Sequence, residues 1–149
     1  MQSFPRAEKE GAVNLAVLNE REDEPGVLSV LQLSHGSDVA LEEARAHYRS
    51  GEWPFIGFAK GDEILACAGA EELGDGTIGI RSIAVVPKLR SRGLARALIE
   101  ALAERMSAER VVAETDDDAV GFYLRCGFSV EDAPHKFGCP RYWCVRESS

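Results

Sequence analysis

The pattern of apolar positions between Trp53 and Val86 predicts three successive strands. Three short apolar runs are separated by two glycine-containing turns: the runs cover residues 55–58, 64–70 and 78–86, and the turns cover residues 60–62 and 73–76. Short apolar runs joined through such turns are typical of β-hairpins. We therefore expect antiparallel neighbours that deliver the chain to Pro87, where the third run ends.

Helical spacing precedes these strands. The acidic run Glu20–Glu24 reads as the solvated start of a helical region that continues to residue 33. The breaker sequence His35-Gly36-Ser37-Asp38 then ends this region and supplies capping residues for a second helix over residues 39–49. His35 and His47 have no carboxylate or nucleophile at a telling spacing, so we interpret them as surface or packing residues.

The remainder of the chain alternates between strands and helices. Leu94, Leu98 and Leu102 recur four residues apart, which predicts an amphipathic helix from about Gly93. The carboxylates between Glu114 and Asp118 precede another helix, and their simplest role is to cap it. The other expected elements are a strand over residues 12–18, a short buried strand over 111–115, a strand after Phe128, a loop containing Ala133-Pro134-His135 and Gly138, and a last strand over 141–145.

Length and charge narrow the class of protein. A chain of 149 residues is about one domain in size, and its formal net charge of -8 disfavours nucleic-acid binding, because phosphate backbones reward a broad basic surface. No apolar run approaches the ~18 residues of a membrane span. We therefore expect a soluble, cytoplasmic protein that binds neither nucleic acid nor membrane. Its four cysteines lack C-x-x-C spacing, so we expect reduced thiols and no metal site.

Positive charge is concentrated after the third strand. Five cations and no carboxylate lie between Arg81 and Arg96, in an acidic chain: they are Arg81, Lys88, Arg90, Arg92 and Arg96. A strand that enters a helix through a glycine-containing turn presents unpartnered amide N–H groups and the positive end of the helix dipole. The stretch therefore predicts an anion site, although an ordinary basic helix start would show the same local pattern.

Two motifs together identify a family. The turn contains Arg90-Ser91-Arg92-Gly93-Leu94-Ala95, which lacks the glycine spacing of dinucleotide folds and of P-loops. Further on, Ala119-Val120-Gly121-Phe122-Tyr123-Leu124-Arg125-Cys126-Gly127-Phe128 has the pattern A-x-x-F-Y-x-x-x-G-F. The pair resembles the [Q/R]-x-x-G-x-[G/A] turn and following helix of the GNAT superfamily of acyl-CoA N-acyltransferases. Family members often have Asn where this chain has Asp116.

The resemblance implies a fold and an acyl donor. The fold would be a single α+β domain over residues 1–149, with a mixed, mostly antiparallel sheet flanked by helices. Acetyl-CoA would place its pyrophosphate on Arg90, Ser91, Arg92, Gly93, Leu94, Ala95 and Arg96. Its pantetheine arm would bind backbone groups of Ile83, Ala84 and Val85, where a strand of this kind splays near a bulge. The Val85 amide could then hold the tetrahedral oxyanion.

The resemblance also implies catalytic groups. Tyr123 would donate a proton to the departing thiolate as general acid, and its alternative is a core aromatic residue. For the general base, Glu71, Glu114 and water remain as candidates. A base is needed less for an α-amine, whose pKa of about 8 leaves it partly neutral at pH 7, than for a lysine amine near about 10.4.

Arg81 is the candidate for binding the acceptor. It lies two residues before the predicted pantetheine stretch, where it could grip a carboxylate of the acceptor. The alternative is an internal salt bridge to Glu71, Glu72 or Glu114. The overall acidity of the chain argues instead for cationic acceptors.

The predicted function is transfer of an acetyl group from acetyl-CoA to a primary amine of a small, amino-acid-like molecule. The alternatives are a protein, peptide or polyamine N-acetyltransferase, and a non-catalytic acyl-CoA sensor. A homodimer is compatible with the sequence.

Overall fold

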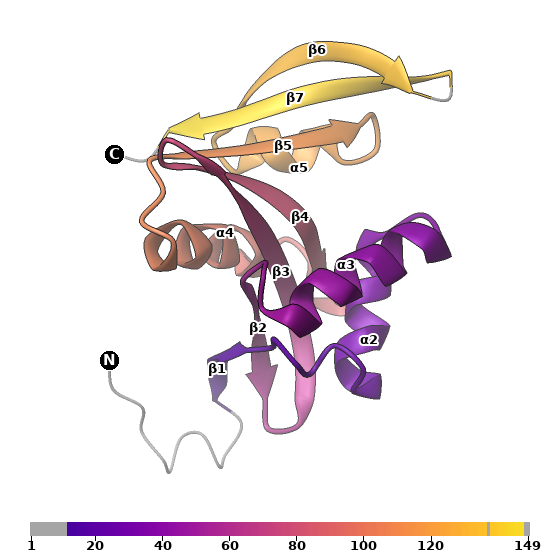
Figure 1. Cartoon of the computed structure of the whole chain (residues 1–149), viewed down its shortest axis with the longest axis vertical. Helices are drawn as coiled ribbons and strands as arrows, with labels where there is room; N and C mark the ends of the chain where they lie inside the picture. Colours follow the sequence, from indigo (N-terminus) through magenta and orange to yellow (C-terminus); the bar gives the residue numbers. More distant parts are fainter. Residues whose placement is uncertain (1–11, 137, 148–149) are drawn as a thin grey trace. The chain divides into compact units, whose positions relative to one another are not determined.

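The computed structural model describes residues 12–136 and 138–147, which form seven strands and flanking helices (Figure 1). The strands are β1 (Val13–Val17), β2 (Phe55–Lys60), β3 (Glu63–Gly74), β4 (Thr77–Val85), β5 (Arg110–Asp116), β6 (Ser129–Lys136) and β7 (Cys139–Glu147). The helices are α2 (Pro25–Leu31), α3 (Asp38–Ser50), α4 (Leu94–Arg105) and α5 (Val120–Arg125), with single 3₁₀ turns η1 (Gln32–Ser34) and η2 (Pro87–Leu89). No helix in this described part is long and apolar enough to cross a membrane.

The strands form one mixed sheet in the order β1-β2-β3-β4-β5-β7-β6. The pairs β1–β2, β2–β3, β5–β7 and β6–β7 are antiparallel, whereas β4 pairs with β5 in parallel over Thr77–Gly79. The predicted α+β class with a mostly antiparallel sheet is therefore confirmed. The chain divides into two compact units, and each is described by itself below; the expected single domain stays a prediction.

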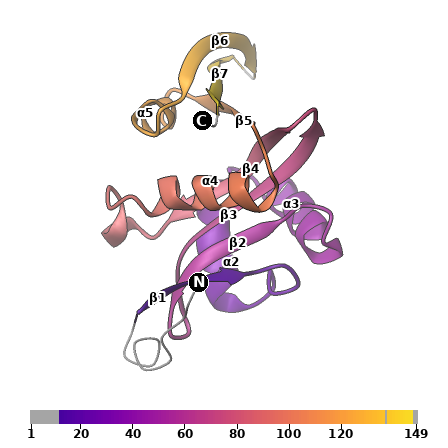
Figure 2. The ribbon, with the colours of Figure 1, turned by 90° about the vertical axis from the view of Figure 1, so that its left-hand side faces the viewer.

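Unit 1 comprises residues 1–71 and 81–102. Its helices α2 and α3 cover one face of the sheet, and α4 lies on the other face (Figures 1 and 2). On the first face, Tyr48 of α3 is fully buried and stacks on Phe55 of β2 with a centroid distance of 4.0 Å. Gly69 of β3 makes room for this ring, because a Cβ there would lie 2.1 Å from the Tyr48 hydroxyl. On α4, Leu98, Ile99 and Leu102 are buried, as their spacing predicts.

The helix ends of unit 1 have local causes. Ser37 Oγ accepts a hydrogen bond from the Ala40 amide at 3.1 Å and caps α3, which ends at Gly51 with φ of 80°. The helical region expected from residue 20 begins only at Pro25, because proline at the first helical position starts a helix. The preceding acidic run is not wholly solvated: Glu22 is 2% exposed and accepts a hydrogen bond from Arg49 Nε at 2.9 Å.

Unit 2 comprises residues 72–80 and 103–149. Here α5 contacts β6 and β7, and Tyr123, Cys126, Phe128 and Cys144 are buried. The loop expected around Ala133-Pro134-His135 is wrong, since β6 runs through these residues to Lys136. Proline is tolerated there because β6 is an edge strand and its pairing with β7 shifts register between Ala133 and Lys136. Gly138, with φ of 75°, lies in the turn that follows.

Candidate functional site

The predicted anion-binding turn lies in unit 1, between the end of β4 and the start of α4. Ser91 and Gly93 both have positive φ, 66° and 82°. The Ala97 amide donates to the Gly93 carbonyl at 3.0 Å, so intrahelical bonding begins at this carbonyl. The amides of residues 94–96 come before the first intrahelical donor and have no partner within the helix. The helix start agrees with the sequence prediction to within one residue.

The backbone of this turn is open at Gly93. A Cβ placed on Gly93 would meet no heavy atom within 4 Å. Glycine is therefore required by the positive φ of this residue and not by the packing of its neighbours. The space next to the first amides of α4 is consequently free for a ligand that approaches the backbone.

Three of the cations around the turn have a carbonyl or carboxylate partner. Arg90 Nε donates to the Val85 carbonyl at 3.2 Å. Lys88 lies 3.6 Å from Glu63, and Arg96 lies 3.6 Å from Glu100, in ion pairs whose side chains are more than half exposed. Exposed pairs of this kind contribute little and exchange easily. The positive charge predicted from the sequence is thus partly balanced, in contacts that an anionic ligand can replace.

The backbone groups on the two edges of β4, near its end, have different hydrogen-bond partners. The Val86 amide donates to the Leu65 carbonyl of β3 at 2.9 Å, so residues of even number face β3 here. The groups of Ile83 and Val85 therefore face the opposite edge. On that edge, Ser34 Oγ accepts from the Ile83 amide at 3.0 Å, and the Val85 carbonyl accepts from Arg90. Side chains, and not a neighbouring strand, thus satisfy two backbone groups of the predicted pantetheine stretch.

Arg81 has the salt bridge that the sequence left as an alternative. Its Nε donates to Glu71 Oε1 at 2.8 Å, and its guanidinium carbon lies 5.6 Å from the centroid of the Trp53 ring. The Trp53 ring also stacks on the His47 imidazole at 3.8 Å and makes an edge contact with the Tyr48 ring at 5.9 Å. Arg81 is nevertheless 41% exposed and Glu71 33% exposed. The pair therefore holds Arg81 in one direction while leaving donors accessible.

A histidine that the sequence analysis interpreted as a surface or packing residue lies close to β4. His35 Nε2 is 2.8 Å from Ser82 Oγ, which also accepts from the Tyr48 hydroxyl at 2.6 Å. Burial lowers the pKa of His35 below its ordinary value and raises the pKa of Tyr48. These residues are 34 to 47 positions apart, so no sequence spacing could have indicated their contact.

Tyr123 of unit 2 lies in an aromatic cluster. It is 5% exposed and makes edge contacts with Phe122 and Phe128 at centroid distances of 4.9 and 5.1 Å. Burial raises the pKa of its phenol, which favours the protonated form. A protonated phenol can donate a proton, so this environment is compatible both with the predicted acid and with a core residue.

Two carboxylates of the acidic run that begins at Glu114 have different kinds of partner. Asp116 Oδ1 accepts from the Asp118 and Ala119 amides, both at 3.1 Å, as a residue before a helix is expected to do. Glu114 pairs with Lys136 at 2.9 Å and Arg141 at 3.0 Å. Burial raises the pKa of Glu114, but the hydrogen bonds and charges of Lys136 and Arg141 outweigh it, so the net pKa is below the ordinary value. Glu114 is therefore a weak base.

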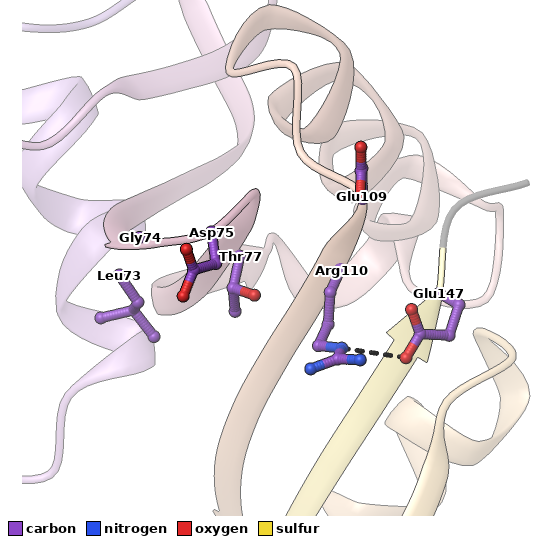
Figure 3. A pocket seen from close by; sticks show the side chains of 7 residues that line it. All are labelled: Leu73, Gly74, Asp75, Thr77, Glu109, Arg110 and Glu147. Atoms are coloured by element: carbon purple, nitrogen blue, oxygen red, sulfur yellow. Dashed lines mark hydrogen bonds and ion pairs between the residues drawn. The ribbon is translucent and has the colours of Figure 1, made fainter.

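A surface pocket of unit 2 contains none of the residues predicted to bind donor or acceptor (Figure 3). Its lining residues are Leu73, Gly74, Asp75, Thr77, Glu109, Arg110 and Glu147. The only cation of this lining, Arg110, donates from Nε to Glu147 at 2.9 Å. The remaining carboxylates give the pocket a negative charge, which does not suit an anionic donor such as a nucleotide phosphate.

Comparison with known proteins identifies the family. The sequence model described as the acetyltransferase (GNAT) family matches residues 16–128, most of the chain. The chain belongs to the GNAT family. The family resemblance predicted from the turn and from the helix around Tyr123 is therefore confirmed. Among curated proteins, no sequence match was found.

Solved structures share the GNAT fold over nearly the whole chain. An IAA acetyltransferase from Bacillus cereus is 16% identical, with a TM-score of 0.69 over 92% of this chain and 100% of its own. A Bacillus subtilis acetyltransferase in complex with CoA is 18% identical, with a TM-score of 0.69 over 93% and 100% of the two chains. A GNAT acetyltransferase from Elizabethkingia anophelis with acetyl-CoA bound is 16% identical, with a TM-score of 0.68 over 91% and 98%.

Proposed function

We propose that this protein is an acetyl-CoA-dependent N-acetyltransferase that acetylates the primary amine of a small, amino-acid-like acceptor by direct attack. The observation that carries the proposal is the strand, turn and helix from Thr77 to Arg105 in a chain of the GNAT family. The relatives crystallised with acetyl-CoA and CoA support acetyl-CoA as the acyl donor.

The turn suits the phosphates of the donor. Open space at Gly93 lets a pyrophosphate oxygen approach the amides of residues 94–96, and the helix dipole stabilises its charge. Arg90 and Arg92 are exposed beside this position and supply charge-assisted donors. Contacts of this kind favour the diphosphate of coenzyme A over an uncharged ligand.

The edge of β4 suits the pantetheine arm. An extended ligand that offers amide groups can bind a strand edge in the manner of an added strand. Replacement of the Ser34 and Arg90 side chains would free the Ile83 amide and the Val85 carbonyl for such a ligand. The Val85 amide, on the same edge, would then polarise the thioester carbonyl and stabilise the oxyanion.

The reaction then needs an amine and an acid. The neutral acceptor amine forms a bond to the carbonyl carbon and its nitrogen releases one proton to a base or to water. The C–S bond breaks, and the sulfur keeps the electron pair. Tyr123 donates its phenolic proton to that sulfur, and its raised pKa keeps the proton in place until the thiolate forms. A buried phenolate is costly, so Tyr123 regains a proton from solvent after each turnover.

Arg81 supports the choice of acceptor. The guanidinium is fixed by Glu71 and by the Trp53 ring, but Arg81 remains 41% exposed. It can therefore donate hydrogen bonds to a second carboxylate. An amino acid presents such a carboxylate next to an α-amine, whose pKa of about 8 makes deprotonation inexpensive. The opposing argument is the net charge of -8, which attracts polyamines and basic peptides.

The experiment that tests the function measures thiol release from acetyl-CoA with a panel of amines: amino acids, polyamines, aminoglycosides and basic peptides. Amine-dependent release by the purified chain is the expected result. A chain that binds acetyl-CoA but releases no thiol with any amine would instead be a sensor of acyl-CoA.

The first prediction concerns the donor. Gly93→Val should weaken acetyl-CoA binding at least about tenfold, because a branched side chain would occupy the space next to the amides and strain the positive φ. Calorimetry with acetyl-CoA measures the change. Gly51→Val is the matched control, since Gly51 has φ of 80° and equally open space but caps α3. Equal acetyl-CoA affinity in the two variants would show that the pyrophosphate does not bind at this turn.

The second prediction concerns the acid. Tyr123→Phe should lower kcat by ~10²–10⁴-fold, the usual contribution of a general acid, while acetyl-CoA affinity stays nearly unchanged. Tyr142→Phe is the control, because Tyr142 loses an exposed hydroxyl bonded to Asp117. Steady-state kinetics with the best amine of the panel gives both values. Wild-type turnover in Tyr123→Phe would return Tyr123 to a purely structural role.

The third prediction concerns the acceptor. Amino acids should outperform spermidine and lysine peptides, and Arg81→Ala should raise their KM about tenfold or more, because it removes a bidentate partner. Arg110→Ala, which removes a more exposed ion pair with Glu147, should leave KM unchanged. Thermal melting reports whether either variant loses stability. A preference for spermidine that persists in Arg81→Ala contradicts the acceptor assignment.

A further inference from the structure

Three polar side chains of unit 1 form a hydrogen-bonded chain beside β4. The Tyr48 hydroxyl donates to Ser82 Oγ at 2.6 Å, and Ser82 Oγ lies 2.8 Å from His35 Nε2. Tyr48 and Ser82 are 0% and 1% exposed, whereas His35 is only partly buried. The chain therefore runs from the core of the unit toward its surface and ends in an imidazole.

The same segment touches the edge of β4 that the proposed function assigns to the acyl donor. Ser34 Oγ accepts from the Ile83 amide at 3.0 Å, one residue along from the contact between His35 and Ser82. Two consecutive residues after α2 thus bind two consecutive residues of β4. An imidazole is held next to the strand whose backbone would bind pantetheine and the thioester carbonyl.

We infer that His35 is the general base that takes the proton lost by the acceptor amine during attack on the thioester. The inference rests on the proposed function, because it needs an amine and an acyl donor. In this step an N–H proton of the amine moves to a ring nitrogen while the nitrogen lone pair forms the bond to the carbonyl carbon. The thiolate leaves with its electron pair and takes its proton from Tyr123, and the imidazolium releases the amine's proton to water.

The hydrogen-bonded chain prepares the ring for this role. Ser82 Oγ has two lone pairs, so it can accept from the Tyr48 hydroxyl and from His35 Nε2–H together. In this tautomer the lone pair of Nδ1, on the other side of the ring, is available for a proton. Burial lowers the pKa of His35, so the imidazole is neutral at pH 7 and able to accept.

The two carboxylates predicted as bases suit the role less well. Glu71 is bound by Arg81, and Glu114 is bound by both Lys136 and Arg141, which lower its pKa. Glu114, whose pKa is lowered, has little tendency to take a proton near pH 7, and the Glu71 oxygen already accepts from Arg81. The histidine has no such cationic partner among its contacts in the described structure.

The other ionisable groups of this hydrogen-bonded chain lie at its buried end. Tyr48 on α3 is the end member, and Cys67 on β3 and Arg81 on β4 are the charged or ionisable neighbours that act on it. Burial raises the pKa of Tyr48 and raises that of Cys67 to about 12, so both remain neutral in the range where His35 titrates. Neither Tyr48 nor Cys67 therefore contributes a rate change below about pH 6.5, the ordinary histidine pKa.

The test compares wild type, His35→Gln and the control His135→Gln, whose histidine is exposed on β6. Glutamine can keep the hydrogen bond to Ser82 but cannot take a proton. With acetyl-CoA and the best amino acid of the panel, H35Q should lose ~10²–10⁴-fold in kcat/KM at pH 7, with unchanged acetyl-CoA affinity. H135Q should match the wild type. The ratio of wild type to H35Q should fall as the pH drops below the His35 pKa.

Two further measurements separate a base from a residue that only holds η1 against β4. Ser82→Ala should lower kcat by about tenfold, less than H35Q, and keep the acid limb of the profile, because the base remains. In the wild type, the plot of log kcat/KM against pH should steepen from slope one to slope two below the His35 pKa. This reading does not depend on the folding of any variant.

Two results would overturn the inference. Wild-type kcat/KM in H35Q, or a wild-type profile with slope one throughout the acid range, shows that His35 takes no proton. If Tyr123→Phe still loses turnover in the same assay, the proposed function stands and only the base is reassigned. Absence of thiol release by the wild type with every amine removes both proposals together.

Discussion

The central constraint in unit 1 is that the end of β4 is hydrogen-bonded to a neighbouring strand, β3, on one edge only. On the other edge, side chains take the place of a strand. The Val86 amide is fixed to the Leu65 carbonyl of β3, which sets the direction of the backbone groups from Ile83 to Val86. Ile83 and Val85 turn toward the other edge, where Ser34 and Arg90 satisfy their polar groups. Because buried backbone groups must be paired, these side chains stabilise the strand and can yield to a ligand that offers the same bonds.

The turn and the end of β4 are continuous in the sequence and both belong to unit 1. One residue, Arg90, belongs to both, since it bonds the last carbonyl of β4 and lies at the beginning of the glycine-containing turn. Lys88 and Arg96 have carboxylate partners in ion pairs that are more than half exposed, so the cost of exchanging these partners for phosphates is small. An acidic protein can thereby present a local site for a polyanionic donor without a basic surface overall.

Most of the fold could be predicted from signals that are local in the sequence. The strands between residues 55 and 85, the turn, and α4 follow from apolar periodicity, glycine and proline, which act over a few residues. Pro134 misled the prediction because proline normally argues against a strand, whereas the edge position and register shift of β6 tolerate it. Glu22 was expected to be solvated because it lies in an acidic run, and its burial depends on Arg49, 27 residues away.

The residues of the candidate site likewise fall into those that local sequence could predict and those that depend on long-range packing. The turn residues and Tyr123 could be found from motifs, because each motif is contiguous. The salt bridge of Arg81 was one of two alternatives, and only the pairing of strands could decide that Glu71 is its partner. The contact of His35 with Ser82 could not be predicted at all, since it depends on how η1 packs against β4.

Amide NMR of the ¹⁵N-labelled chain during titration with coenzyme A tests directly whether the donor binds at the end of β4 and the start of α4. The largest shift changes and the greatest gain in exchange protection should fall on Ile83, Val85 and the first amides of α4, residues 94–96. Residues around the pocket of unit 2, such as Thr77 and Arg110, should change little. Saturable binding that leaves the β4 edge and the α4 amides unchanged, or that perturbs the unit 2 pocket instead, would contradict this binding site.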